Sequence, residues 1–206
     1  MLTLVLETPG KLIATEAAEP TSTPGDDEVL VRVHRVGVCG TDLHAYAGRQ
    51  PYFTYPRIMG HELGVEVLAA GKNVSHVAIG DRCAVEPYLN CGRCIACTHG
   101  KPNCCRSLQV LGVHTDGGHR AKMLLPASKL HRSTKLSYDQ LALVETLGIG
   151  AHAVVRAQLQ PGENVAVIGA GPIGLAVMQF AGAAGARVIA VDVSPSRLAF
   201  CRERMG

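Results

Sequence analysis

Four closely spaced cysteines constrain this chain more than any other feature of its sequence. They follow a C-x2-C-x2-C-x7-C spacing, at Cys91, Cys94, Cys97 and Cys105. The short gaps let neighbouring thiolates converge on one small ion, and the longer arm brings the last thiolate around to close a tetrahedron. The spacing predicts a structural zinc site, with no coordination position left open for a substrate, in a lobe at about residues 88–108.

Three other interpretations of these cysteines stay open at this point. Disulfides need an oxidising compartment, and an iron–sulfur cluster prefers three residues and then Cys-Pro after the third cysteine. The thiols could also be free and unrelated. Cys104 is a spare thiol beside the motif, and it could take the place of Cys105.

The start of the chain and its charge bear on the compartment and the partners. Met1 to Glu7 lack a basic region, and their apolar run is too short for a signal peptide. We therefore expect a cytoplasmic, reducing setting, in which thiols serve metal binding or chemistry. The formal net charge is only +3 and no lysine or arginine run is present, so we expect no nucleic-acid partner.

An uncharged stretch over residues 164–186 approaches the length of a membrane-spanning helix. Glycines and a proline interrupt it after a β-branched start. A buried parallel strand, a glycine turn and a helix explain this pattern better than a membrane span, so we expect no membrane partner.

The pattern of apolar and polar residues changes near residue 147. Before it, alternating apolar and polar residues predict short strands at 28–36, 63–70 and 81–86. An Ala/Leu-rich stretch over 138–157 is helical in pattern, and a strand, glycine turn, helix, strand and helix follow. These patterns predict a β-rich domain over 1–147 and an α/β domain over 148–206.

A glycine motif opens the predicted α/β domain. Gly169, Gly171 and Gly174 form G-x-G-x-x-G directly after the predicted strand, and Pro172 and Ile173 stand in the first turn of the predicted helix. Such glycines permit a tight turn and let the backbone approach a pyrophosphate, which rests on the helix N-terminus. A glycine turn that binds no nucleotide is the alternative.

A second strand, predicted over 187–193, carries Asp192 about 20 residues beyond the glycines, as the dinucleotide fingerprint requires. A carboxylate there accepts from the ribose 2′-hydroxyl and repels a 2′-phosphate, so NAD is favoured over NADP as the cofactor. Arg197 follows, and it would lie along the adenosine ribose or simply cap its surroundings.

Cys39, His61 and the acidic Glu62 offer a mixed set of sulfur, nitrogen and oxygen ligands. A catalytic zinc uses such a set and keeps one position open for water or substrate. Taken singly these residues say little, because a lone cysteine at a strand end is more often buried packing. Their occurrence upstream of the four-cysteine motif strengthens the interpretation.

Together the motifs resemble the zinc-dependent medium-chain alcohol dehydrogenase family, in its polyol or sorbitol dehydrogenase-like branch. The hallmarks are G-V-C-G-T-D-L-H over 37–44, G-H-E-L-G over 60–64, G-D-R over 80–82, the four cysteines and the glycine motif. The resemblance covers almost the whole chain. It implies a β-rich GroES-like catalytic domain followed by a Rossmann domain, two zinc ions per chain, NAD, and a homo-oligomer for the full-length form.

The resemblance also implies roles for single residues. Cys39 and His61 match catalytic-zinc ligands, and Glu62 matches an adjacent acid that ligates the metal or exchanges with water. Glu145 occupies the position of the third protein ligand, where glutamate is typical of the branch that acts on polyols, sugars or sugar acids. Thr146 departs from the proline common in that branch. Glu145 could instead be a solvated acid at a helix start.

The same resemblance implies a proton relay. Asp42 would accept from a zinc-ligand imidazole, Thr41 would accept the proton of the substrate hydroxyl, and His44 matches the outer end of the relay. An ordinary exposed histidine is the alternative for His44. The implied activity is that of a zinc-dependent oxidoreductase, transferring hydride between a small secondary alcohol and NAD.

The predicted α/β domain supplies two strands, whereas a dinucleotide-binding sheet typically has about six. We therefore expect an incomplete Rossmann domain and a C-terminally truncated enzyme whose exposed sheet edges favour association. A catalytically inactive zinc-binding fragment is the alternative function. A zinc-free reductase on the same fold is a third possibility, against which the ligand residues argue.

Overall fold

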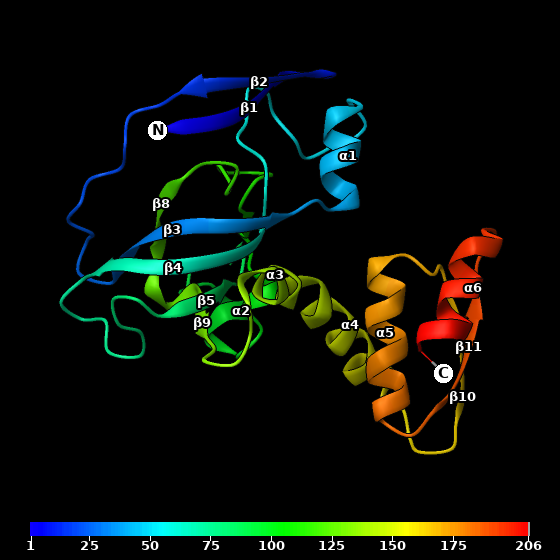
Figure 1. Cartoon of the computed structure of the whole chain (residues 1–206). Coiled ribbons are helices and arrows are strands. Elements are labelled where there is room, and N and C mark those ends of the chain that lie inside the picture. The colour runs from blue at the N-terminus through cyan, green and yellow to red at the C-terminus, as the bar shows by residue number, and fades with distance from the viewer. Residues whose placement is uncertain (206) are drawn as a thin grey trace. The chain divides into compact units, whose positions relative to one another are not determined.

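The computed structural model describes residues 1–205. The chain divides into two compact units, Met1–Glu145 and Thr146–Gly206. Figure 1 shows the strands and helices of each unit along the chain. The division falls inside helix α4 (Val144–Ala157).

A five-stranded antiparallel sheet is the largest sheet of the first unit. Its order is β8 (Lys122–Pro126), β3 (Glu28–Gly37), β4 (Glu62–Ala70), β5 (Arg82–Val85) and β9 (Leu130–Arg132). The strands predicted over 28–36, 63–70 and 81–86 are confirmed as β3, β4 and β5. The β-rich part of the fold prediction is therefore confirmed.

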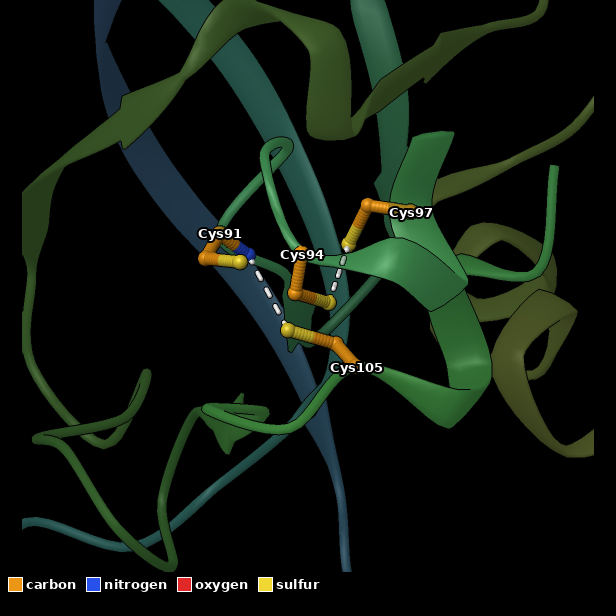
Figure 2. A group of neighbouring side chains, drawn as sticks. All are labelled: Cys91, Cys94, Cys97 and Cys105. Carbon is orange, nitrogen blue, oxygen red and sulfur yellow. Dashed lines mark hydrogen bonds between the residues drawn. The ribbon is translucent and has the colours of Figure 1, made fainter. Parts of the chain in front are cut away.

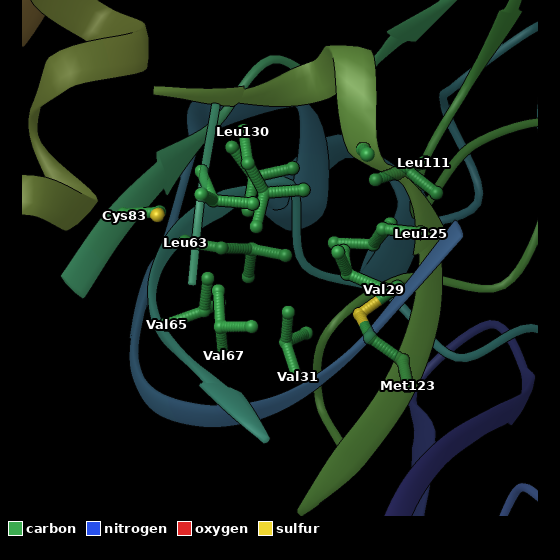
Figure 3. Packing of buried hydrophobic residues seen from close by; sticks show 13 residues of the cluster. Val29, Val31, Leu63, Val65, Val67, Cys83, Leu111, Met123, Leu125 and Leu130 are labelled. Carbon is green, nitrogen blue, oxygen red and sulfur yellow. The ribbon is translucent and has the colours of Figure 1, made fainter. Parts of the chain in front are cut away.

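The core of this unit lies on one face of the sheet, because alternate strand residues point to the same side. Val29, Val31, Leu63 and Met123 are each at most 1% exposed and belong to one apolar cluster (Figure 3). Burying one such side chain contributes about 1.5–3 kcal/mol. This packing holds β3 and β4 together, and the candidate metal ligands lie at or next to the end of β3 and the start of β4.

A hairpin that the sequence did not predict precedes the sheet. Strand β1 (Leu2–Thr8) pairs with β2 (Lys11–Glu16) in antiparallel register. Leu6 on β1 is fully buried against Ala45, which lies on helix α1 (Gly40–Tyr46). The hairpin therefore packs near the segment that carries the first candidate ligands.

The four cysteines lie among short elements. These are β6 (Tyr88–Leu89), α2 (Ile95–Thr98), the 3-10 helix η1 (Pro102–Cys104) and β7 (Gln109–Val110). Strands β6 and β7 pair in antiparallel register, with Tyr88 opposite Val110. A second 3-10 helix, η2 (Ala127–Lys129), leads from β8 into β9.

Two helices replace the one predicted over 138–157. They are α3 (Tyr138–Ala142) and α4, and Leu143 separates them. Helix α3 begins with a capping box, in which the Ser137 hydroxyl accepts from the Gln140 amide at 3.2 Å and the Gln140 side chain accepts from the Ser137 amide at 2.9 Å.

The second unit is a parallel strand pair with helices. Strand β10 (Asn164–Ile168) pairs with β11 (Arg187–Val191), and α5 (Pro172–Ala183) connects them before α6 (Pro195–Arg204). Val167 and Ala190 face the helices in a small core with Met178 and Cys201. This unit confirms the predicted α/β pattern as part of a dinucleotide-binding fold.

Strand β11 ends at Val191 and not at residue 193, as the sequence had indicated. The Asp192 side chain accepts the Ser194 amide at 2.8 Å, so a local turn replaces the ladder there. Among residues 1–205, no helix is both long enough and apolar enough to cross a membrane.

Candidate metal centres and nucleotide turn

The four-cysteine lobe brings its sulfur atoms together (Figure 2). The ligand atoms of Cys91, Cys94, Cys97 and Cys105 all lie within 4.8 Å of one another, and the Cys94 and Cys97 sulfurs are 3.6 Å apart. Tetrahedral zinc with Zn–S bonds of about 2.3 Å separates its sulfurs by about 3.8 Å. The lobe therefore fits a four-thiolate zinc ion. The exposed Cys104 lies outside this group.

Backbone amides surround these sulfurs. The Cys105 sulfur accepts from the amides of Cys91 at 3.3 Å and Ser107 at 3.4 Å. The amides of Cys97 and Arg106 lower the pKa of Cys94 to about 6. Backbone amides also lower the pKa of Cys91, whereas burial and Cys94 raise that of Cys97. Because metal binding requires thiolates, Cys91 and Cys94 are the members of the lobe that are most readily available to a cation.

A second candidate centre joins the end of one strand to the start of another. The ligand atoms of Cys39, His61 and Glu62 lie within 4.8 Å of one another. Cys39 is the N-cap residue of helix α1, two residues after the end of β3, and Glu62 is the first residue of β4. Gly37 pairs with Glu62 across the two strands, and a methyl group on Gly37 would lie 2.1 Å from the Glu62 carboxylate.

Asp42 lies next to two of these candidate ligands, Cys39 and His61. Its side chain is 4% exposed, Oδ2 accepts from the Cys39 amide at 3.0 Å, and Oδ1 lies 3.8 Å from His61 Nδ1. Hydrogen bonding with His61 lowers the pKa of Cys39. Burial lowers the pKa of His61, but Cys39 and Asp42 outweigh it, so the net pKa is raised. A half-buried cysteine beside a buried imidazole is a donor set suited to zinc.

The two predicted relay residues lie on α1. Within residues 1–205 the buried Thr41 hydroxyl makes no hydrogen bond of ordinary geometry, although it lies close enough to the Cys39 sulfur to help lower the pKa of that thiol. Such a buried group is costly unless a ligand satisfies it. His44 is exposed on the same helix.

Glu145 lies outside the group of three close ligand atoms. Its Oε1 accepts a hydrogen bond from the Tyr88 hydroxyl at 2.7 Å. Burial, and then Glu145, raise the pKa of Tyr88, so this hydroxyl keeps its proton and donates. Sequence reasoning missed Tyr88, because no local pattern links it to a residue so far along the chain.

The glycine motif forms a tight turn between β10 and α5. Gly169 has φ +100°, a conformation that favours glycine. A methyl group on Gly174 would lie 1.8 Å from the Gly169 carbonyl oxygen, whereas one on Gly171 would meet no atom within 4 Å. Pro172 and Ile173 occupy the first helical turn, and Ile173 is 39% exposed. The turn thus leaves open space at the helix N-terminus, where a pyrophosphate would fit.

Asp192 lies beside this turn. Its Oδ2 accepts from the Ala170 amide at 2.6 Å, and an Arg197 nitrogen lies 3.7 Å from the same oxygen. The Ala170 and Ser194 amides lower the pKa of Asp192. A carboxylate offers about four lone-pair sites, so acceptor capacity remains for ribose hydroxyls.

Comparisons with known proteins agree with this arrangement. The alcohol dehydrogenase GroES-like domain family matches residues 25–135. L-galactonate-5-dehydrogenase of Escherichia coli K12 is 43% identical over 197 residues, which are 96% of this chain and 57% of that protein.

Solved structures match as well. Galactitol-1-phosphate dehydrogenase from Escherichia coli superposes with a TM-score of 0.92 at 32% identity, over 98% of this chain and 59% of that one. The RspB alcohol dehydrogenase of E. coli CFT073, complexed with NADH, gives a TM-score of 0.90 at 36% identity, over 98% of this chain and 60% of that one.

The chain therefore spans somewhat more than half the length of the relatives that it matches. The family match covers more than half of the chain itself. The family match, together with the two groups of candidate metal ligands and the glycine turn, confirms the resemblance inferred from the motifs. The chain belongs to the zinc-type medium-chain alcohol dehydrogenases, and it carries their GroES-like domain and part of their Rossmann domain.

Proposed function

We propose that the protein contributes to zinc-dependent hydride transfer between a secondary alcohol and NAD. Residues 1–147 would carry the zinc chemistry and residues 148–206 the NAD contacts. The observation that carries the proposal is the convergence of Cys39, His61 and Glu62 within 4.8 Å, with the buried Asp42 behind them.

Each cofactor would supply one part of the chemistry. Zinc held by Cys39 and His61, with Glu62 as a ligand that can exchange with water, would act as a Lewis acid toward the substrate hydroxyl. The nicotinamide of NAD would accept the hydride. A second zinc, held by the four cysteines of the lobe, would be structural.

The side chains around the centre would then position the substrate and move its proton. The buried Thr41 hydroxyl would accept the proton of the substrate hydroxyl, and the exposed His44 would pass it toward solvent. Asp42 would hold the His61 imidazole in one orientation through its buried carboxylate.

Glu145 is the proposed third protein ligand. Because Tyr88 occupies its Oε1, Oε2 remains for the metal, and the tyrosine would fix the carboxylate orientation. A glutamate ligand favours polyols, sugars or sugar acids as substrates. Two matched relatives are named for L-galactonate and galactitol-1-phosphate, a sugar acid and a polyol phosphate.

NAD is proposed over NADP because of Asp192. Its carboxylate is ionised at neutral pH, and the Ala170 and Ser194 amides lower its pKa further. A negative charge at this position repels a 2′-phosphate and accepts from a 2′-hydroxyl. Arg197 lies close enough to balance that charge.

A zinc-binding chain without turnover is the second candidate. The observation that favours it is the two-stranded sheet of the second unit, since a dinucleotide-binding sheet typically has about six strands. Its discriminating property would be zinc binding without nucleotide binding.

The test is zinc per chain by elemental analysis, paired with titration calorimetry of NAD and an alcohol screen weighted to polyols. The proposal expects two zinc ions, NAD binding and turnover, and Cys39→Ala should lose one zinc and all turnover. One zinc without NAD binding would support the second candidate. Turnover retained in Cys39→Ala would contradict the proposed metal centre.

A further inference from the structure

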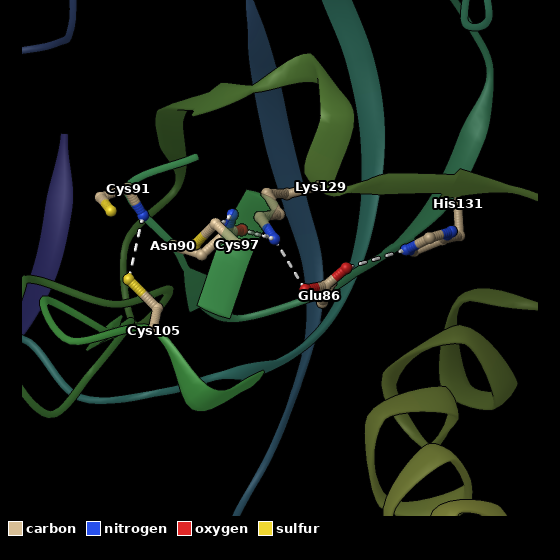
Figure 4. Close-up of polar contacts among 7 residues, drawn as sticks. All are labelled: Glu86, Asn90, Cys91, Cys97, Cys105, Lys129 and His131. Atoms are coloured by element: carbon tan, nitrogen blue, oxygen red, sulfur yellow. Dashed lines mark hydrogen bonds and ion pairs between the residues drawn. The ribbon is translucent and has the colours of Figure 1, made fainter. Parts of the chain in front are cut away.

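A buried lysine lies beside the four-cysteine lobe (Figure 4). Lys129, at the end of η2, is 8% exposed. Its ammonium group donates to Glu86 Oε1 at 2.7 Å and to Asn90 Oδ1 at 2.8 Å. A buried charge requires such partners, because removing an unpaired ammonium group from water is strongly unfavourable.

The lysine determines how the Asn90 amide is oriented. An ammonium group only donates hydrogen bonds, so the Asn90 atom that faces it must be the carbonyl oxygen. The amide nitrogen then faces the Cys97 sulfur, at 3.7 Å. Because that nitrogen only donates, the sulfur must accept, as a metal-bound thiolate does.

The network also anchors the lobe to the sheet. Glu86 directly follows β5, and its amide donates to the Lys129 carbonyl at 2.8 Å. His131 on β9 lies 3.7 Å from the other Glu86 oxygen. Asn90 stands directly before Cys91, the first cysteine of the lobe. The sheet therefore contacts the lobe through a directed series of donors and acceptors.

We propose that Asn90, oriented by Lys129, is a positioning residue that donates a hydrogen bond to the zinc-bound Cys97 thiolate. Four thiolates around one Zn²⁺ carry a net charge of about −2. The donated hydrogen bond and the nearby ammonium offset part of that charge, so they strengthen zinc binding by the lobe. The inference rests on the proposed structural zinc of the lobe.

The experiment measures zinc affinity of the full chain by competition with a chromophoric chelator, in a Cys39→Ala background so that the lobe dominates the signal. Asn90→Ala is expected to weaken zinc binding about tenfold or more, as loss of a group behind a metal ligand typically does. Lys101→Met, at an exposed lysine of the same lobe, is the matched control and should bind zinc normally.

Lysine removal is tested together with its partner. Lys129→Met combined with Glu86→Gln removes both charges, so no unpaired ion stays buried. The triple variant adds Asn90→Ala to this double variant. If the lysine acts through the Asn90 amide, the triple variant should bind zinc no more weakly than the weaker binder of the two, the double variant or Asn90→Ala alone. If the loss of zinc affinity in the triple variant equals the product of the two separate losses, the proposed action of Lys129 through Asn90 is overturned.

Cobalt substitution separates positioning from plain structural support. Loss of the hydrogen bond raises the energy of the sulfur lone pair, so the sulfur-to-cobalt absorption of Asn90→Ala should move to longer wavelength. A folded Asn90→Ala chain with normal zinc affinity and an unshifted band would overturn the inference alone. Failure of the Cys39→Ala chain itself to bind zinc would instead overturn the proposed zinc lobe.

Discussion

At the scale of single residues, a glycine beside a candidate metal ligand leaves the space that the ligand side chain occupies. Gly37 lies opposite Glu62 in the β3–β4 ladder, and a methyl group there would lie 2.1 Å from the carboxylate oxygen and 2.8 Å from Glu62 Cβ. Gly40, three residues later, has open space at the same position. The two glycines therefore make a matched pair for testing the candidate catalytic centre.

Gly37→Ala is expected to displace the Glu62 carboxylate and to weaken zinc binding at this centre about tenfold or more. The measurement is zinc per chain after dialysis against a weak chelator. The four-cysteine lobe should keep its zinc in the variant. Gly40→Ala should behave like the unaltered chain, and equal zinc retention by both variants would contradict the role given to Glu62.

At the scale of elements, Asp192 joins the end of β11 to the turn that follows β10. It accepts the Ala170 amide of that turn at 2.6 Å and the Ser194 amide, ahead of α6, at 2.8 Å. One carboxylate thus links the ends of the two strands to the segments that precede α5 and α6. Its protonation should loosen all of these connections together.

The stability of the second unit should therefore depend on pH through Asp192. The Ala170 and Ser194 amides hold its folded pKa below the ordinary value, so the stabilisation is fully present above the unfolded pKa of about 3.9. It is lost as the pH falls through the lower folded pKa.

Hydrogen exchange over residues 164–194 at matched pH is the measurement. Below about pH 4, the native chain should lose protection against exchange in this segment. Asp192→Asn, which cannot ionise, should lack the same protection already at neutral pH. Asp139→Asn, at a carboxylate 72% exposed in the first unit, is the control. Identical pH profiles for the native chain and Asp192→Asn would disprove the link.

At the scale of the whole molecule, one face of the β10–β11 pair carries exposed apolar side chains. Ile168 pairs with Val191, and Ala166 with Ile189, so these residues share a face. Ile168 is 86% exposed, Ile189 53% and Val191 45%. Parallel sheets usually bury both faces, so an open face of this kind favours association.

We expect the isolated chain to self-associate with rising concentration. Ile168→Thr combined with Ile189→Thr should weaken that association about tenfold or more, since burial of one such side chain contributes about 1.5–3 kcal/mol. Sedimentation velocity over a range of concentrations is the measurement. Ile79→Thr, at a 73% exposed isoleucine of the first unit, is the control. A monomer at all concentrations would refute the expectation.

Local patterns explain why much of the molecule could be read from the sequence. The cysteine spacing, the glycine turn and the alternation in β3 and β4 each depend on residues close together in the chain, and backbone geometry translates such patterns directly into structure. The hairpin of β1 and β2 was missed, and the helix over 138–157 proved to be two, because packing and capping decide short elements.

The sequence by itself determined the family, the β-rich and α/β parts, and which residue types could bind metal and nucleotide. Only the tertiary structure decided that Tyr88 holds Glu145, and that Lys129 orients Asn90 toward Cys97. The physical reason is that these contacts join residues from separate elements. No local sequence pattern predicts that a lysine is buried, and only the folded structure determines which groups lie close enough to pair with its charge.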